Sequence, residues 1–408
     1  MWLRLKVAFR NVFRNRRRTV LNVLMISGGV SSMILFQGFA HRMVEGLRET
    51  TIRTQTGHLQ VATKAYWNKT ARTQGQSLIP DYSNLLKEIK ETPHVRYASG
   101  RLTLFGLLTN GDKSHSAQGV SFDPAAEANR TRAFRFIKGH GLSAGMPFEI
   151  ALGKGLAKRI AAKPKDRITL LANTFDGAVN AMDMEVSGIF ETAIAEFDDN
   201  SFILPLSTAQ TLLDTKGVEQ IVVGLDHTTS TRPILASLDR GLKSSYPSLR
   251  VRPWYEVAQL YNQVASFNRV QNKAFQFIMV TLVLLSILNT VGMSIMERTG
   301  EIGTVRALGE TGRSVVLQFV LEGIFLGLLG GLGGVLAGSL IAHLVNVSKV
   351  TMQLPGASSV FIVEIHLLKR SIQDGLVLAV FTAVAASLLP ALRASRMNVC
   401  EALRRNFQ

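Results

Sequence analysis

The chain has 408 residues, of which 47% are hydrophobic and 18% charged, and its formal net charge is +17. The hydrophobic residues form long uninterrupted blocks, as in proteins that cross a membrane. The basic residues lie beside these blocks and not along a recognition helix, which argues against nucleic-acid binding. Because Cys400 is the single cysteine, an intrachain disulfide is excluded.

The N-terminal segment 1–18 is strongly basic, and residues 19–40 contain no charged side chain. About twenty apolar residues in a helix cross the hydrocarbon core of a bilayer, so 19–40 is predicted to be the first transmembrane helix. The run is longer than the apolar part of an ordinary signal peptide, and no small-residue cleavage site precedes His41. We therefore expect an uncleaved span.

Residues 41–272 have the composition of a large folded α/β domain outside the membrane. A hairpin is predicted where run 103–109 meets Asn110 and Gly111, because Asn-Gly turns match the twist of paired strands. Its second strand is 116–120. The other predicted elements are strands at 167–171, 184–190 and 201–205 and helices at 84–91, 153–162, 207–214 and 233–245. The flanks 42–54 and 254–273 are expected to be helical, either as stalks or as plain connectors.

Three further apolar runs, 275–296, 315–347 and 375–392, are predicted to span the membrane. They are joined by a charged segment, 297–314, and a loop, 348–374, and a tail, 393–408, follows. Basic residues are concentrated in 1–18, 297–314 and the tail, which places these segments and both termini in the cytoplasm. The predicted fold class is an α-helical membrane protein with four transmembrane helices plus a large α/β extracytoplasmic domain inserted between helices 1 and 2.

The segment 297–314 is charged and amphipathic and lies between two predicted spans. This placement favours an element that couples the membrane helices to a partner over a simple interfacial loop. As a helix, it would carry its apolar and charged side chains on different faces. The candidate coupling residues are Glu297, Arg298, Glu301, Ile302, Gly303, Val305, Arg306, Ala307, Leu308 and Gly309.

Glycines recur at three- and four-residue spacing along the third predicted span, which permits the close approach of another helix. That helix is expected either in the same chain or in a second copy. The candidate packing residues are Gly323, Gly327, Gly330, Gly331, Gly334 and Gly338.

Three polar side chains lie within the predicted spans. Glu322 is about two turns into the third span at 1.5 Å per residue, which favours a structural contact near the cytoplasmic face over a proton relay. Asn289 and His343 are interpreted in the same way, as contacts within the helix bundle.

No catalytic or metal site is predicted. Residues 141–145 match the G-x-S-x-G pattern, but neither a strand before it nor a helix after it is predicted, so Ser143 is assigned to a surface turn. The histidines lack metal-binding spacing, and the sequence contains no G-x-x-x-x-G-K-[ST] phosphate-binding loop. We therefore expect no catalytic residue, metal or cofactor on this chain, and we expect ATP to act elsewhere.

Several segments resemble the FtsX-type permeases of type VII ABC systems, which include lipoprotein-releasing and macrolide-exporter permeases. Residues 8–19 look like the cytoplasmic amphipathic entry helix of that family, 297–309 resemble its coupling segment and 390–404 its closing motif. The pieces 153–157 and 187–190 are similar to recurring parts of its outer domain. The sequence departs from the family at Val399-Cys400, where Pro followed by a β-branched or small apolar residue is usual, and at Lys165-Asp166, where Gly-Asp is common.

The resemblance implies mechanotransmission by a non-catalytic subunit of the bacterial inner membrane. A separate cytoplasmic ATPase dimer, which holds ATP and Mg, would bind two permease subunits, either two copies of this chain or this chain and a related permease. Its closure would move the coupling segments and, through the stalks, the periplasmic domains. Charged contacts to the ATPase are expected from Arg298, Glu301 and Arg306, and groove-filling contacts from Ile302, Val305 and Leu308. Exchanging charges by Glu301→Lys with Arg306→Glu is expected to uncouple the ATPase without preventing insertion.

The resemblance also bears on the substrate class. Lipoprotein release or trafficking is favoured, because the match is to a permease that is not fused to its ATPase. A split tripartite efflux pump with a periplasmic adaptor has the same layout and stays an alternative. A signalling permease that activates a cell-wall hydrolase is less favoured, because the outer domain is large for that class. Besides membrane lipids, the expected partners are therefore a lipoprotein, a periplasmic adaptor or a carrier.

Overall fold

The computed structural model describes residues 2–68, 77–127, 134–192, 194–352 and 361–397. The chain divides into two compact units. The membrane unit comprises Met1–Val44, Ala265–Thr351 and Ile362–Gln408, and the inserted domain comprises Glu45–Val264 with Met352–Phe361. Val399 and Cys400, where the sequence departs from the family pattern, lie outside the described residues. The same holds for all of residues 398–408 of the predicted tail.

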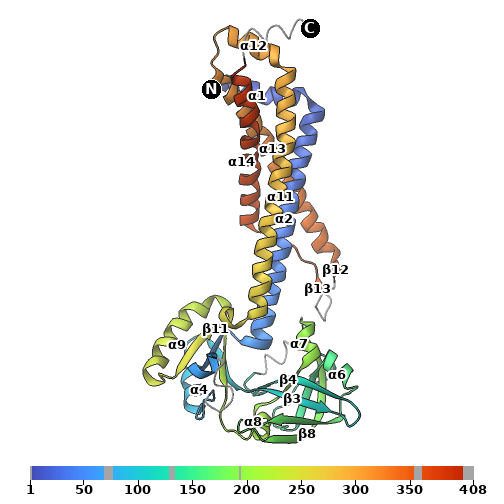
Figure 1. The fold of residues 1–408 in the computed structure, drawn as a ribbon, viewed down its shortest axis with the longest axis vertical. Helices are drawn as coiled ribbons and strands as arrows, with labels where there is room; N and C mark the ends of the chain where they lie inside the picture. Colours follow the sequence, from blue (N-terminus) through green and yellow to red (C-terminus); the bar gives the residue numbers. More distant parts are fainter. Residues whose placement is uncertain (1, 69–76, 128–133, 193, 353–360, 398–408) are drawn as a thin grey trace. The chain divides into compact units, whose positions relative to one another are not determined.

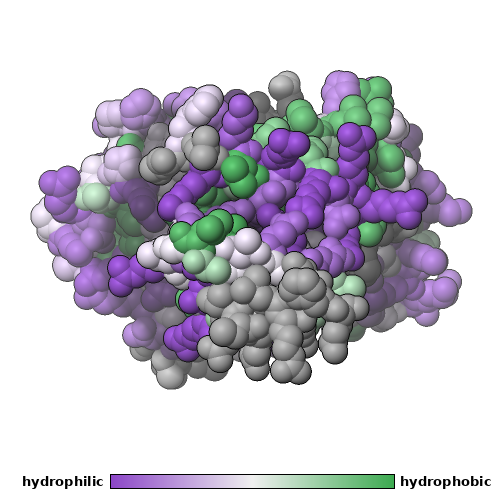
Figure 2. All heavy atoms as spheres, turned by 90° about the horizontal axis from the view of Figure 1, so that it is seen from above, coloured by the Kyte–Doolittle hydropathy of each residue, from purple (hydrophilic) through white to green (hydrophobic). Residues whose placement is uncertain are grey.

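Four helices of the described chain are long and apolar enough to cross a membrane. They are α2 (Arg16–Thr51), α11 (Gln259–Glu297), α13 (Gly312–Ser348) and α14 (Lys369–Ser395). Two shorter helices, α1 (Trp2–Arg14) and α12 (Thr299–Ala307), lie at one end of the membrane unit, near the N-terminus (Figure 1). Seen from that end, the surface is largely hydrophilic, with hydrophobic areas between the polar side chains (Figure 2). The short strands β12 (Thr351–Met352) and β13 (Phe361–Ile362) pair before α14 begins.

The predicted helical flanks are largely helical. Helix α2 continues to Thr51 and is followed by a π-helix, η1 (Ile52–Thr56), while the second flank contains α10 (Trp254–Val257) and the start of α11. Both long helices therefore extend beyond the apolar runs, and the polar residues at their ends are helical as well.

The glycines of α13 lie on two faces of that helix, and both faces pack against helices of the same chain. A Cβ added to Gly323, Gly327 or Gly331 would meet α14, at Ala383, Val380 and Leu376 respectively. A Cβ added to Gly330, Gly334 or Gly338 would meet α2, at Ile26, Val30 and Ser31 respectively. All six glycines are buried. Their lack of side chains therefore lets α13 approach both neighbours closely.

The packing of α13 predicts a strong effect of Gly327→Leu. A Cβ at Gly327 would lie 2.9 Å from the Val380 Cα atom, so α13 and α14 would have to separate. We expect a loss of about 3 kcal/mol of stability, as for overpacked cores, measured by thermal unfolding of the full chain in detergent. Gly28→Ala on α2 is the matched control, because no atom lies within 4 Å of its added Cβ. Equal melting temperatures for both variants would contradict this packing.

The prediction that Asn289 and His343 are contacts within the bundle is wrong, since both side chains are exposed. Helix α11 instead turns Ser286 and Thr290 toward α2, where both hydroxyls donate to the Asn22 Oδ1 atom over 3.2 and 3.0 Å. The polar residues of α11 are therefore divided between an inner and an outer face.

The inserted domain is an α/β domain between the first and second long helices, as predicted. Its strands are β1 (Leu59–Thr63), β2 (Val95–Arg101), β3 (Thr103–Thr109), β4 (Ser114–Phe122), β5 (Arg135–Gly139), β6 (Glu149–Gly153), β7 (Arg167–Asn173), β8 (Val179–Glu191), β9 (Ser201–Pro205), β10 (Gln220–Leu225) and β11 (Leu249–Pro253). Its remaining helices are α3 (Lys64–Trp67), α4 (Ser83–Lys90), α6 (Lys154–Arg159), α7 (Ala195–Asn200), α8 (Leu206–Leu212), η2 (Thr228–Ser230) and α9 (Thr231–Ser245).

The strands form two sheets. A four-stranded antiparallel sheet has the order β11-β1-β10-β2, and a seven-stranded sheet has the order β5-β8-β6-β9-β4-β3-β7. Strand β7 also pairs with β8, so six strands of the larger sheet close into a ring and only β5 stands outside it. Closing a sheet in this way removes its exposed edges.

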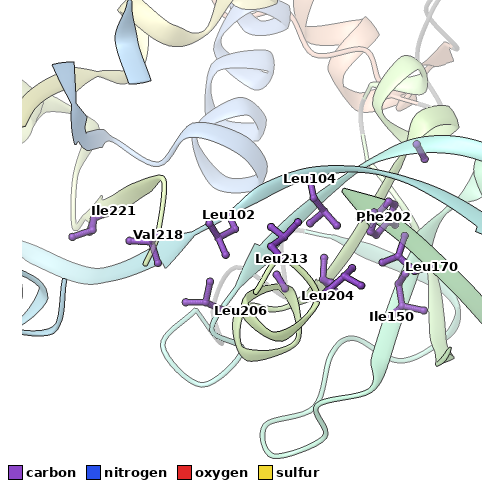
Figure 3. Packing of buried hydrophobic residues seen from close by; sticks show 14 of the residues in the cluster. Leu102, Leu104, Ile150, Leu170, Phe202, Leu204, Leu206, Leu213, Val218 and Ile221 are labelled. Carbon is purple, nitrogen blue, oxygen red and sulfur yellow. The ribbon is translucent and has the colours of Figure 1, made fainter. Parts of the chain in front are cut away.

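Besides two smaller clusters around Phe190 and Trp254, the domain has one large apolar core (Figure 3). It includes Leu102 and Leu104 at the junction of β2 and β3, and Phe202 and Leu204 on β9, all of which are buried. Alternate residues of β3 and β7 point into this core, as expected for strands with one buried face. Burial of these side chains is the main stabilising term for the domain.

A half-buried histidine ties the end of α2 to the smaller sheet. The Leu225 N–H donates to His58 Nδ1 over 3.0 Å, and His58 Nε2 lies 3.2 Å from the Thr228 hydroxyl. That hydroxyl donates in turn to Glu49 Oε1 over 3.2 Å. Since Nδ1 accepts a hydrogen bond, the neutral ring carries its proton on Nε2. Burial lowers the pKa of His58 from 6.5 to about 4.

His58 predicts that the folded chain loses stability as the pH falls. The unfolded chain binds a proton on His58 near pH 6.5, whereas the folded chain binds it only near pH 4. The contribution of neutral His58 to the free energy of unfolding is therefore fully present above about pH 6.5. As the pH falls from there to 4, this contribution decreases by up to about 3 kcal/mol. Thermal unfolding of the full chain at pH 7 and pH 5 measures this loss. His58→Gln should have a smaller difference between the two pH values, and an equal difference would contradict the role of His58.

Candidate coupling site

Helix α12 forms the centre of the predicted coupling segment. Helix α11 ends at Glu297, the backbone turns at Arg298, and the nine residues Thr299–Ala307 form α12. Gly309 ends the helix with φ +100°, a conformation that favours glycine, and its N–H bonds to the Arg306 carbonyl. The short helix is thereby held as a separate unit between α11 and α13.

One face of α12 is buried in the membrane unit and the other is exposed. Ile302 is 9% exposed and packs in the same apolar cluster as Val315 and Phe319 of α13. Thr299, Gly300 and Gly303 are buried beside it. On the outer face, Val305 is 42% and Leu308 is 84% exposed. Exposed Ala307 and Gly309 flank Leu308.

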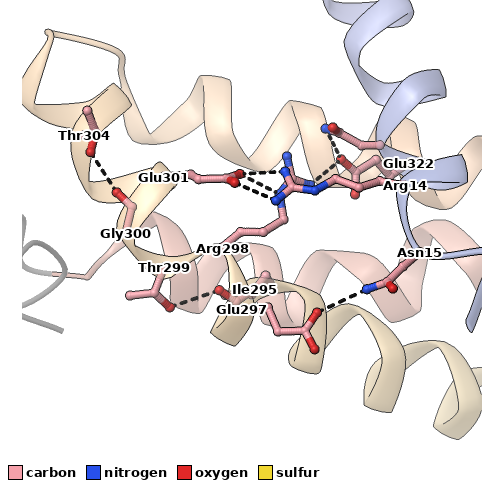
Figure 4. Close-up of polar contacts among 11 residues, drawn as sticks. Arg14, Asn15, Ile295, Glu297, Arg298, Thr299, Gly300, Glu301, Thr304 and Glu322 are labelled. Atoms are coloured by element: carbon pink, nitrogen blue, oxygen red, sulfur yellow. Dashed lines mark hydrogen bonds and ion pairs between the residues drawn. The ribbon is translucent and has the colours of Figure 1, made fainter. Parts of the chain in front are cut away.

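Basic residues of the N-terminal segment pair with the acids around α12. Arg14 contacts Glu301 over 2.7 Å, Arg18 contacts Glu297 over 2.6 Å, and Arg4 contacts Glu310 over 3.2 Å. Asn15 also donates to Glu297 over 3.2 Å (Figure 4). The hydrogen bond from Arg14 is the main cause that lowers the pKa of the Glu301 carboxyl below its usual value. Exposed pairs of this kind add little stability individually, but together they hold the N-terminal segment, from Arg4 on α1 to Arg18 on α2, against the acids around α12.

A more buried group of polar residues lies at the junction of three helices. Glu322 of α13 accepts from the Asn11 amide of α1 over 2.8 Å and from Arg298 Nη1 over 3.2 Å. Arg298 Nε also donates to Glu301 over 3.2 Å, so the guanidinium bridges two acids (Figure 4). We call Asn11, Arg298, Glu301 and Glu322 the Arg298 cluster. The side chains of Arg298 and Glu322 are only 15% and 11% exposed.

The contacts of Glu322 confirm the prediction of a structural polar contact with a basic neighbour. The sequence did not reveal that the N-terminal helix supplies one of the partners, Asn11. Its basic, amphipathic pattern was the available signal, but pairing Asn11 with Glu322 joins residues 311 positions apart. Arg306 likewise donates to the Met397 carbonyl over 2.6 Å. The charge exchange Glu301→Lys with Arg306→Glu would therefore break contacts within the chain as well.

The G-x-S-x-G segment forms a turn. Contrary to expectation, a strand, β5, precedes it closely, because the run Arg135–Gly139 pairs with β8. The next element is the strand β6 and not a helix, and the Ser143 hydroxyl donates to Glu149 over 3.3 Å. The geometry is that of a turn between strands and lacks the helix of a nucleophile elbow.

The inserted domain contains an open cavity of about 680 Å³. Residues of β3, β4 and β7 form a large part of its lining, and the rest comes from η1, Ile194, α7, β8, β9 and α11. The apolar part of the lining includes Phe105, Leu107, Val179, Phe197 and Leu260. Phe105 and Val179 are 69% and 71% exposed, so this apolar surface is open to solvent.

Comparison with known proteins gives two family matches and several relatives. Residues 19–240 match the MacB-like periplasmic core domain, and residues 273–399 match the C-terminal part of FtsX-like permeases. The chain is 26% identical to the lipoprotein-releasing system transmembrane protein LolE of Haemophilus influenzae, over 80% of this chain and 81% of that protein. It is 24% identical to LolC of Neisseria meningitidis, over 79% and 81%. It is 21% identical to an ABC transporter permease of Methanocaldococcus jannaschii, over 97% and 96%.

The two family matches cover the parts that the structure separates. The first covers most of α2 and of the inserted domain, and the second runs from within α11 through α12 and α13 to the end of α14. The order of parts is therefore that of a multi-pass inner-membrane permease with a periplasmic domain after its first span. This chain belongs to the family of FtsX-like ABC transporter permeases that carry a MacB-like periplasmic core domain.

Proposed function

We propose that this chain converts ATP hydrolysis by a separate cytoplasmic ATPase into movement of its periplasmic domain, and that this movement serves lipoprotein release or trafficking. The observation that carries the proposal is α12, which has an exposed apolar face and is tied to α1 and α13 through the Arg298 cluster. A helix with these two properties can receive a push on one face and pass it to the spans on the other.

In this mechanism, both termini and α12 lie in the cytoplasm, and Val305 and Leu308 enter a groove of the ATPase. ATP and Mg²⁺ bind on that partner, where ATP binding closes the ATPase dimer. The displacement of α12 moves Arg298, which pulls on Glu322 of α13 and, through Asn11 and Glu301, on α1. Helices α2 and α11 then act as the stalks, since each is one continuous helix whose residues belong to both units.

Two observations support a lipoprotein as the substrate. The relatives LolE and LolC, which match along about four-fifths of this chain, are named as lipoprotein-releasing proteins. The open cavity of about 680 Å³ in the inserted domain offers an apolar lining to an acyl chain or another apolar group. The cavity would offer such a group apolar contacts while the protein part of the substrate stays outside.

Affinity purification of the tagged full-length chain from membranes tests this function, with mass spectrometry of the retained proteins and an ATPase assay. We expect a small ATPase subunit together with lipoproteins. A periplasmic adaptor in place of lipoproteins would instead identify a tripartite efflux pump, and a cell-wall hydrolase would identify a signalling permease. Absence of any ATPase would overturn the proposal.

A further inference from the structure

Helix α1 carries two kinds of basic side chain. Arg4 and Arg14 form ion pairs with acids around α12. Lys6 and Arg10 are exposed, and neither has an acidic partner among the residues that the structure describes. These two cations are four residues apart, so they lie one above the other on the same face of the helix. This face of α1 is therefore positively charged and open to an external group.

A stripe of exposed aromatic side chains runs along α1. Trp2, Phe9 and Phe13 are 78%, 49% and 44% exposed. Their spacings of seven and four residues place them on one side of a helix with 3.6 residues per turn. Ala8 and Val12 lie on a different side of α1, and both are buried. The aromatic stripe is therefore outside the core of the helix bundle.

The neighbours of the stripe indicate that it contacts lipid. The ring of Phe9 lies 5.6 Å from the ring of Phe325 on the membrane-spanning helix α13, so the stripe continues the apolar surface of a span. The Lys6 ammonium lies 5.9 Å from the centre of the Trp2 ring, which places the cations directly beside the stripe. Helices with this arrangement lie in the interface of a bilayer, with the rings at the acyl boundary and the cations among the headgroups.

The charge around α1 selects the kind of headgroup. Arg16 and Arg17, at the start of α2, are exposed and also lack an acidic partner within the described ranges. The nearby acids Glu297, Glu301 and Glu310 are each paired with an arginine already. The remaining charge is therefore positive, which attracts an anionic lipid and gives no advantage to a zwitterionic one. Each Lys or Arg near an anionic membrane surface strengthens binding about fivefold.

We propose that the outer surface of α1 is a binding site for anionic phospholipids, and we call it the α1 lipid site: Trp2, Lys6, Phe9, Arg10 and Phe13. Lys6 and Arg10 contact the lipid phosphate groups, while the three aromatic rings lie between the upper parts of the acyl chains. Because α1 is also paired with the acids around α12, bound lipid holds α1 in the position that supports the coupling site.

Fluorescence quenching of Trp2 in the full-length chain tests the site. The chain has three tryptophans, and the other two, Trp67 and Trp254, belong to the inserted domain. Quenching by lipids that carry bromine near the headgroup end of one acyl chain therefore reports on Trp2. We expect brominated phosphatidylglycerol to be enriched about fivefold over brominated phosphatidylcholine next to Trp2 in mixed bilayers, which is the contribution of one cation. Lys6→Gln with Arg10→Gln should lower this enrichment to about one.

Two controls define the signal. Trp2→Phe should remove the quenching by both lipids. Lys349→Gln with Lys369→Gln removes two exposed cations, one just after α13 and one at the start of α14, at the other ends of these spans. This matched loss of charge should leave the enrichment at Trp2 unchanged.

Three results would overturn the proposal. Equal quenching by the two lipids, or an unchanged enrichment after Lys6→Gln with Arg10→Gln, would mean that these cations bind no anionic headgroup. Absence of quenching by either lipid would place the aromatic stripe outside the bilayer and leave it to a protein partner. The bilayers contain neither ATP nor another protein, so each of these results would leave the proposed function standing.

Discussion

Leu308→Glu is expected to weaken binding of the cytoplasmic ATPase about thirtyfold and to abolish most of the hydrolysis that depends on this chain. Leu308 is 84% exposed at the end of α12, beside Val305, which is 42% exposed. If these side chains fill a groove of the ATPase, a carboxylate at position 308 would be buried without a partner. Central interface residues of this kind contribute about 2 kcal/mol or more, which corresponds to thirtyfold in affinity.

The measurement is the ratio of ATPase to permease after purification of the tagged full-length chain. Leu308→Met keeps an apolar side chain and should leave the ratio unchanged. Phe148→Glu introduces the same charge at a residue that is 57% exposed in the inserted domain, and it should also have no effect. Retention of the ATPase at the normal ratio by Leu308→Glu would show that the exposed face of α12 is not its binding surface.

The membrane part of the fold could be predicted because its signal is local. A run such as 19–40 contains no charge, and length and apolar character alone are enough to indicate a span. The hairpin of β3 and β4 was predictable for a similar reason. Gly111 at its turn has φ +95°, and Asn110 Oδ1 accepts from the N–H groups of Asp112 and Lys113. These contacts form between residues that are neighbours in the sequence.

The central strands of the inserted domain were missed because their pairing is not local. Strand β10 is buried at every residue and therefore shows no alternation of polar and apolar side chains. Its partner β1 lies about 160 residues earlier, where Leu59 pairs with Val223. The prediction of the coupling site was incomplete for the same reason. The sequence indicates that Arg298 and Glu301 belong to a coupling segment, but only the folded positions of α13 and α1 show that Arg298 bonds to Glu322 and Glu301 to Arg14.

Arg298→Met is expected to cost about 3 kcal/mol of stability. The change leaves the Glu322 carboxylate, which is 11% exposed, with the Asn11 amide but without the guanidinium. Removing one partner of a buried ion pair is strongly destabilising because the remaining charge is uncompensated, whereas replacing both partners by neutral groups is nearly without cost. The double change Arg298→Met with Glu322→Gln should therefore recover most of the melting temperature of the full-length chain.

The double variant separates structure from mechanism. If the Arg298 cluster passes the movement of α12 to α1 and α13, this variant should assemble with the ATPase and hydrolyse ATP, while substrate release per ATP falls about tenfold, within the usual range of coupling free energies. Arg4→Ala with Glu310→Gln removes an ion pair whose side chains are 46% and 40% exposed, and it is the matched control. It should change stability by less than about 1 kcal/mol and leave release per ATP unchanged. If the Arg298→Met, Glu322→Gln chain releases the normal amount of substrate per ATP, the cluster only holds α12 in place. A purely structural role requires stability alone, and this double variant has regained its stability.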